Sequence, residues 1–207
     1  MVHISPLPDS PTHYEHHLGN VAYARRDFFT AITHYTRALD SLPLDSTNES
    51  LLPLTATLYC NRAAARLKLA SISDADERPA HYTHVIQDAT RALDLLDSHP
   101  TLSPPLCSLR VKALHRRKCA HLSLDHIRAA AQDAHTLATL RPEYTAEAGE
   151  LASRADAHAE KQKTEALDQL KELGNSLLGH FGLSLDNFQP TRNPDGTYSI
   201  QYSSKPT

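Results

Sequence analysis

The sequence predicts an all-α solenoid of three helix pairs, followed by a long C-terminal capping helix and a short terminal β-hairpin or irregular tail. Three observations lead to this fold class. One pattern of small and aromatic residues recurs three times. Glycine is rare, with six in 207 residues, while Ala and Leu recur throughout. Most of the 13 prolines stand between apolar segments, where they end helices.

The first repeat covers about residues 12–45 and follows a segment, residues 1–11, that we expect to be flexible. Small, aromatic and helix-breaking residues stand at the offsets of a helix–turn–helix repeat of about 34 residues, namely Gly19, Ala31, Tyr35, Ala38 and Pro43. The two small residues at 19 and 31 let a pair of helices approach closely. Tyr35 and Ala38 share one face of the second helix, and Pro43 ends it.

The second repeat covers about residues 56–99. We expect a first helix around 58–65 and a second at 82–96, with small or apolar residues at the matching offsets: Val85, Ala89 and Ala92. An insertion of about ten residues, which includes 74–79, separates the two helices. Its polar composition indicates a loop or a lengthened helix end.

The third repeat covers about residues 111–144, with helices expected at 111–122 and 125–140. The pattern residues are Ala130, Ala134 and Leu137, and Pro142 ends the second helix. Long polar linkers are expected before the second and third repeats, at 44–55 and 101–105. Three repeats are about the minimum for a stable stack.

The remaining chain predicts a cap and a tail. Residues 145–180 are rich in Ala, Glu and Lys and form one long helix that caps the open end of the solenoid. In the tail, residues 181–207, a turn signal at 193–196 precedes alternating polar and apolar residues at 197–202, which predicts a short hairpin. A lone hairpin is marginal in water, so it must pack on something or be partly disordered.

Composition narrows the class of partner. The net charge is −3 with the 14 histidines neutral, so nothing demands nucleic acid or an anionic membrane. No run of about 18 apolar residues predicts a membrane span, and the first six residues lack the basic start and apolar core of a secretion signal. Three scattered cysteines (Cys60, Cys107 and Cys119) indicate small buried side chains in a reducing compartment rather than a disulfide framework. We therefore expect a cytoplasmic protein.

Four polar residues recur at matching places in the first helix of each repeat: Asn20, Asn61, Lys112 and Arg116. Lys112 and Arg116 stand four residues apart and so share one helix face. Stacking the three first helices side by side brings all four into one concave strip. Two amides and two permanent cations can hold a terminal α-carboxylate and a neighbouring aspartate side chain, with neutral and charge-assisted hydrogen bonds respectively.

At these residues the sequence resembles the carboxylate-clamp class of tetratricopeptide-repeat co-chaperones. That class carries K-x-x-G-N, N-R-[AS]-A and K-x-x-x-R in its three first helices, and the motifs hold the C-terminal E-E-V-D of heat-shock proteins 90 and 70. The resemblance covers Asn20, Asn61, Lys112 and Arg116, while His16 stands where the first lysine is expected. Because histidine is mostly neutral at neutral pH, binding is expected to strengthen below about pH 6.5.

The C-terminal third resembles the tail of the tetratricopeptide repeat protein 1 family, on residues 170–175, 181–188 and 196–200. The resemblance implies a cytosolic chaperone-linked adaptor with an unidentified client protein. Four apolar tail residues either pack the tail or form a patch that binds the client: Phe181, Leu183, Leu185 and Phe188. Residues 171–175 mimic a clamp motif but lie in the capping helix, where polar surface is needed anyway.

Other chemistry is disfavoured. Five histidines invite a metal site but are scattered over helix faces without a CxxC or HExxH set: His13, His16, His17, His81 and His84. Ser123, Asp125 and His126 imitate a nucleophilic set, yet neighbours in sequence cannot face each other on a helix. We therefore expect a protein-binding adaptor with no metal, cofactor or catalytic residue. The alternative is a scaffold subunit that binds partners through its tail or outer surface, with a vestigial groove.

Overall fold

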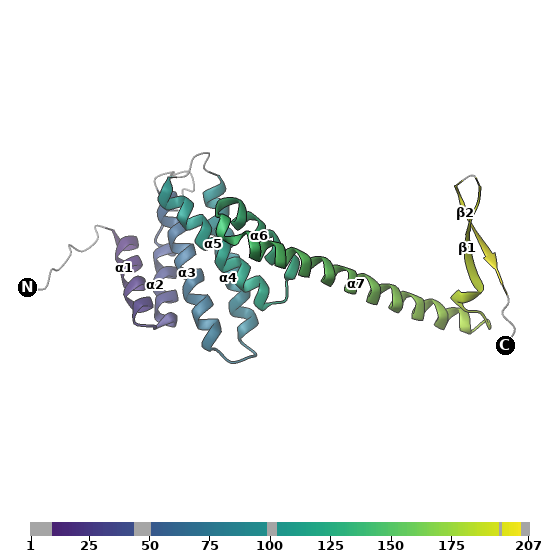
Figure 1. The fold of residues 1–207 in the computed structure, drawn as a ribbon. Coiled ribbons are helices and arrows are strands. Elements are labelled where there is room, and N and C mark those ends of the chain that lie inside the picture. The colour runs from purple at the N-terminus through teal and green to yellow at the C-terminus, as the bar shows by residue number, and fades with distance from the viewer. Residues whose placement is uncertain (1–9, 44–50, 99–102, 195, 204–207) are drawn as a thin grey trace, which may run out of the picture. The chain divides into compact units, whose positions relative to one another are not determined.

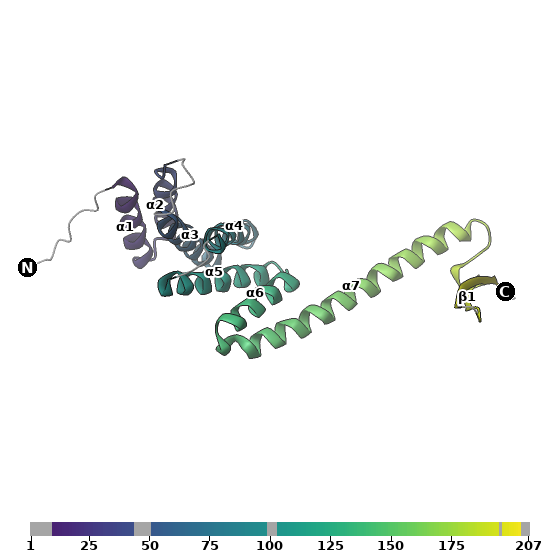
Figure 2. The same ribbon diagram turned by 90° about the horizontal axis from the view of Figure 1, so that it is seen from above.

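The computed structural model describes residues 10–43, 51–98, 103–194 and 196–203. Within them the chain forms helices α1 to α7 and a two-stranded antiparallel sheet (Figures 1 and 2). It divides into two compact units, residues 1–155 and 156–207, and the division falls within α7. The predicted flexible segment 1–11 lies outside the described residues except for Ser10 and Pro11, which begin α1.

The first unit contains the three predicted helix pairs, so the predicted fold class is confirmed. The pairs are α1 Pro11–Ala24 with α2 Phe28–Asp40, α3 Leu52–Ile72 with α4 Arg78–Asp97, and α5 Pro104–Ser123 with α6 Ile127–Leu140. Each helix packs on the next along the chain, and α3 also contacts α5. The first helices of the second and third repeats, α3 and α5, therefore lie side by side, and Asn61 on α3 donates a hydrogen bond to Asn20 on α1.

The helices α3, α4 and α5 begin earlier than the pattern predicted. α3 and α5 each carry proline in the first turn, where no helical hydrogen bond is lost with its N–H, so the expected linkers 44–55 and 101–105 are wrong at their C-terminal ends. In the second repeat, residues 73–77 form the turn between α3 and α4, which are 21 and 20 residues long. α6 starts two residues late because Asp125 has φ 58°, which is incompatible with a right-handed helix.

Alanine dominates the core of this unit. Alanines at the pattern positions are fully buried, among them Ala31, Ala38, Ala63, Ala89, Ala92, Ala130 and Ala134. Such small side chains keep neighbouring helix axes close, so backbone and larger residues such as Tyr35 fill the space. Cys60 is buried as predicted, but Cys107, in the first turn of α5, is exposed and Cys119 is half-buried.

A half-buried arginine links three helices at the second repeat. The guanidinium of Arg62 on α3 donates two hydrogen bonds to the carboxylate of Asp88 on α4, at 2.7 and 3.0 Å, and a third to Thr36 Oγ1 on α2, at 3.0 Å. Arg66 joins the same carboxylate at 2.7 Å. Asp88 is only 3% exposed at its side chain, so its charge depends on these arginines.

The same arrangement recurs at the third repeat. Arg117 on α5 donates to Asp133 on α6, at 2.6 to 3.2 Å, and to Thr90 on α4 at 3.1 Å. Arg62 and Arg117 therefore occupy equivalent places, each tying its helix to its own partner and to the preceding repeat. These ion pairs were missed by the sequence analysis, because nothing in a local pattern pairs residues 16 to 27 positions apart.

The N-terminal turns of α7, Thr145–Gly179, cap the first unit. Ala148 and Leu151 pack with Ala134 of α6. Lys118 of α5, only 2% exposed, pairs with Glu147 in the first turn of α7. The prediction that the helix after Pro142 covers the last repeat agrees with these contacts.

The second unit contains the rest of α7 and the predicted hairpin. Strands β1 Phe188–Arg192 and β2 Tyr198–Tyr202 pair antiparallel, with Phe188 opposite Tyr202. The turn between them includes Gly196 at φ 86°, a conformation that glycine adopts without strain. Among the helices of the described residues, none has the length and apolar character of a membrane span.

Replacing Asp88 with alanine should lower the free energy of unfolding by about 3 kcal/mol, because two half-buried arginines lose their shared carboxylate. Urea unfolding followed by circular dichroism measures the change. Asp94→Ala, at an exposed site on the same helix, serves as the control and should shift stability by less than about 0.5 kcal/mol. Equal losses in the two variants would show that the Asp88 ion pairs contribute nothing.

Candidate functional site

The repeat register places the predicted groove residues in two rows on the first helices. Asn61 and Arg116 each directly precede one of the equivalent arginines, Arg62 and Arg117, and so occupy equivalent positions on α3 and α5. Lys112 lies one turn before Arg116, just as His16 lies one turn before Asn20 on α1. The structure therefore repeats the same two positions along three neighbouring helices.

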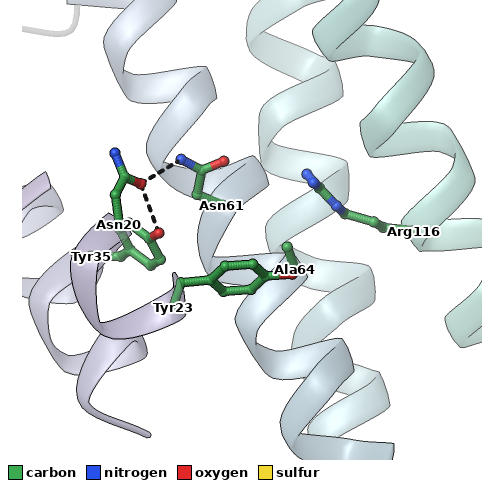
Figure 3. A pocket seen from close by; sticks show the side chains of 6 residues that line it. All are labelled: Asn20, Tyr23, Tyr35, Asn61, Ala64 and Arg116. Atoms are coloured by element: carbon green, nitrogen blue, oxygen red, sulfur yellow. Dashed lines mark hydrogen bonds between the residues drawn. The ribbon is translucent and has the colours of Figure 1, made fainter. Parts of the chain in front are cut away.

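Three of the five predicted residues meet in one pocket. The pocket has a volume of about 200 Å³. Figure 3 shows the side chains that line it: Asn20, Tyr23, Tyr35, Asn61, Ala64 and Arg116. In this view the guanidinium of Arg116 reaches from α5 toward the amide of Asn61. Side chains from α1, α2, α3 and α5 thus converge on one hollow.

The two amides are held by a hydrogen-bond network. Tyr35 donates its hydroxyl proton to Asn20 Oδ1 at 2.9 Å, and Asn61 Nδ2 donates to the same oxygen at 3.4 Å (Figure 3). Burial raises the pKa of Tyr35 to about 12, so its hydroxyl keeps the proton that it donates. With its oxygen occupied in this way, Asn20 presents its N–H₂ group toward the groove.

His16 joins this network as an acceptor. Its Nε2 lies 3.3 Å from Asn20 Nδ2 and 3.3 Å from Asn61 Nδ2. An amide nitrogen only donates, so Nε2 carries a lone pair and the ring is neutral. Burial, followed by the neighbouring His13 and His17, lowers the pKa of His16. In the free groove His16 therefore gains charge only at a lower pH than the sequence alone predicted.

The two cations differ in their surroundings. Arg116 donates from Nη1 to the carbonyl oxygen of Cys60 at 2.8 Å and also contacts the Cys60 sulfur, which anchors the guanidinium to α3. Lys112 is exposed and makes no ion pair with any other residue in the described ranges. It is not among the residues that line the pocket, but it stands one turn away on the same face. Arg116 is thus positioned in advance, while Lys112 is free to reach a ligand.

Gly19 makes the close packing behind the site possible. A Cβ atom at this position would lie 2.5 Å from Tyr35 Cε1 and 2.7 Å from Cδ1. The aromatic ring of Tyr35 therefore packs directly against the α1 backbone at Gly19. Its hydroxyl reaches Asn20, which is the next residue along α1. The sequence predicted a close approach of two helices at Gly19, and the ring of Tyr35 fills the space beside this glycine.

The tail residues singled out from the sequence have different surroundings. Leu185 packs against Gly174, and Phe188 lies 5.7 Å from the ring of Tyr202, so both contribute to packing inside the second unit. Leu183 is half-buried, whereas Phe181 is 80% exposed. In the clamp-like segment 171–175, Asn175 accepts a hydrogen bond from the Leu185 backbone at 2.7 Å and so has a structural partner.

Several leucines on α7 were missed by the sequence analysis. Leu170, Leu173 and Leu177 are 64%, 64% and 71% exposed, and their spacing of three and four residues places them on one face. The spacing itself was the available signal, but the segment was interpreted only as a polar cap. These leucines form an exposed apolar stripe on α7, and the exposed Phe181 follows just after the helix ends.

The histidines and the set around Ser123 that the sequence analysis considered have the following surroundings among the described residues. No three His, Cys, Asp or Glu side chains gather there in a way that could hold a metal ion. Ser123 donates its hydroxyl proton to the Cys119 carbonyl oxygen, and His126 lies beside His121 rather than beside Ser123. Neither observation assigns these residues a chemical role.

Comparison with known proteins gives the fold a name. No model of a protein family matches the chain. The N-terminal domain of stress-induced protein-1 (STI-1) from C. elegans is similar, with a TM-score of 0.52 and 23% identity over 70% of this chain and 99% of that chain. The Arabidopsis OM64 TPR domain gives 0.48 and 27% over 72% and 96%. The first TPR of Spaghetti (RPAP3), bound to the HSP90 peptide SRMEEVD, gives 0.49 and 21% over 70% and 96%. The chain has the tetratricopeptide-repeat fold.

Replacing Gly19 with alanine should lower the free energy of unfolding by about 1–3 kcal/mol, because the new methyl group would overlap the Tyr35 ring. Chemical denaturation of both proteins measures it. Gly149→Ala is the matched control, since a Cβ there meets nothing within 4 Å and should stabilise α7 by about 0.5–1 kcal/mol. If Gly19→Ala were as stable as Gly149→Ala, the contact with Tyr35 would have no energetic role.

Proposed function

We propose that this protein is a non-enzymatic cytoplasmic adaptor whose groove binds the acidic C-terminal tail of heat-shock protein 90 or 70. One observation carries the proposal: Asn20, Asn61 and Arg116 come from three different helices and line a single pocket. Lys112, a second cation, stands one turn from Arg116 on the same helix face. A peptide that ends in two carboxylates supplies the negative charge and the hydrogen-bond acceptors that complement these amide donors and cations.

The mechanism is recognition of two carboxylates. Lys112 and Arg116 attract and hold the acidic groups through charge-assisted bonds, each contributing about 1.5–3 kcal/mol. Asn20 and Asn61 orient the ligand through neutral N–H donors, which Tyr35 and the Asn20 carbonyl keep in place. After the cost of ordering the peptide and the side chains, four such contacts support roughly micromolar affinity.

The second unit extends the proposal to a client. The residues that resemble the tetratricopeptide repeat protein 1 family, 170–175, 181–188 and 196–200, all lie there. We assign the protein to that kind of chaperone-linked adaptor, in which one part of the chain holds the chaperone and another holds a client protein.

Lys112→Ala or Arg116→Ala should weaken binding of a peptide ending in E-E-V-D by about tenfold or more, since each variant removes a charge-assisted contact. Isothermal titration calorimetry on the full chain measures the affinities. Lys161→Ala removes the same charge from an exposed site on α7 and should leave affinity within about twofold. Unchanged affinity in both groove variants, with tight binding in the wild type, would refute the clamp.

A second candidate function rests on the exposed apolar stripe of Leu170, Leu173 and Leu177 on α7. Contiguous exposed apolar side chains of this kind mark interaction surfaces. In this alternative the protein is a scaffold subunit that binds its main partner through the second unit, while the groove plays no part.

The two candidates are separable by substitution. Leu173→Glu with Leu177→Glu should remove the main partner from affinity-purified complexes if the stripe is the binding surface, because two charges would replace its centre. Lys161→Gln with Lys163→Gln changes the net charge equally at exposed sites outside residues 170–181 and is the control. Loss of the chaperone in Lys112→Ala alone, with the other partners retained, identifies the groove as the chaperone site.

A further inference from the structure

We propose that binding a chain-end carboxylate in this groove takes up one proton onto His16 Nε2, so that His16 is a third cation of the site only while the ligand is bound. This inference rests on the proposed function. Protonated His16 would take the place of the lysine that carboxylate-clamp proteins carry at this position. Proton uptake then becomes a measurable property of ligand binding.

The free groove holds His16 in its neutral form. Nε2 accepts from both Asn20 Nδ2 and Asn61 Nδ2, each at 3.3 Å, which requires a lone pair on that nitrogen. The side-chain amides of Asn20 and Asn61 are not free to flip and exchange their oxygen and nitrogen atoms. Asn20 Oδ1 already accepts hydrogen bonds from Tyr35 at 2.9 Å and from Asn61 at 3.4 Å. The N–H groups that a carboxylate needs are therefore directed at an imidazole lone pair.

A carboxylate that engages these amides comes into reach of the same nitrogen. Its oxygens must approach Asn20 Nδ2 and Asn61 Nδ2 to about 3 Å, and both atoms lie beside Nε2. Two acceptors would then face each other. A proton on Nε2 turns that repulsion into a charge-assisted N–H···O hydrogen bond. In this step the neutral imidazole takes up one proton from solvent, and the resulting imidazolium pairs with the carboxylate. No other bond changes.

Burial and two neighbouring histidines oppose the protonation of His16 in the free protein. On its own helix, His13 and His17 lower its pKa, as does burial. From α2 it meets Tyr35, a neutral phenol whose ring centre lies 6.2 Å away, and from α3 the neutral Asn61. From α5 the groove receives the positive Arg116 and Lys112.

No carboxylate within the described ranges offsets these charges at His16. Burial, His13 and His17 are the influences on its pKa, and all three lower it. The nearby Glu15 is already paired with His34 at 2.7 Å. The ligand therefore supplies the anion that this ring lacks, and its arrival raises the pKa of His16 from below its ordinary value.

The experiment is calorimetric titration of the full chain with a peptide ending in E-E-V-D, at about pH 7, in phosphate and in Tris. These buffers differ in ionisation enthalpy, so the difference in observed enthalpy counts the protons taken up. Wild type should take up a substantial fraction of one proton, and affinity should fall by about tenfold between pH 6 and pH 8. The same peptide with a C-terminal amide should bind more weakly and take up none.

Two variants at His16 and one at a distant histidine assign the proton. His16→Gln and His16→Lys should bind without proton uptake and with an affinity that is flat over this pH range, and His16→Lys should bind more tightly than wild type above pH 7. His180→Gln, at an exposed site on the second unit, should keep the uptake of the wild type. Thermal unfolding of each variant confirms that it is folded.

The failures are distinguishable. Peptide binding by the wild type without proton uptake overturns this inference and leaves the proposed function standing. Uptake that persists in His16→Gln assigns the proton to another group and also overturns it. A wild-type protein that binds no peptide even at pH 6 overturns the proposed function, and this inference with it.

Discussion

The groove depends on the buried pairing of arginine with aspartate that recurs between repeats. Arg62 joins α3 to Asp88 on α4 and to Thr36 on α2, and Arg117 makes the equivalent bonds one repeat later. A bidentate guanidinium fixes both rotation and height of its helix, since two parallel hydrogen bonds allow little sliding. The residue just before each arginine is thereby aimed at the same strip, which is how Asn61 and Arg116 come to face one pocket.

The first repeat has no such arginine and uses close packing instead. Gly19 lets the Tyr35 ring lie on the α1 backbone, and the tyrosine hydroxyl then holds Asn20. In the first repeat Tyr35 thus orients the groove side chain, as the arginine–aspartate ion pairs do in the second and third repeats. The alanine-rich core serves the same end, because short side chains bring α1 and α3 close enough for Asn20 and Asn61 to bond directly.

The resulting site is electrically asymmetric. Both permanent cations of the clamp set lie on α5, whereas α1 and α3 offer amides and a neutral imidazole. Arg116 is fastened to the α3 backbone and Lys112 is free, so one cation is preorganised and the other adapts. A ligand with two carboxylates therefore meets two different environments, and the end bound at α1 is the one where protonation matters.

The sequence by itself determined the three helix pairs, the long helix from Thr145 and the hairpin around Gly196, because these follow from periodicity and turn residues within a few positions. It also predicted that Asn20, Asn61 and Arg116 share one groove, and the structure brings these three residues together in one pocket, since repeats copy position as well as fold. Only the tertiary structure decided that His16 is a hydrogen-bond acceptor, that Arg116 rests on Cys60 and that Asp88 joins two arginines. Those facts arise between residues 22 to 56 positions apart, where no local pattern carries the information.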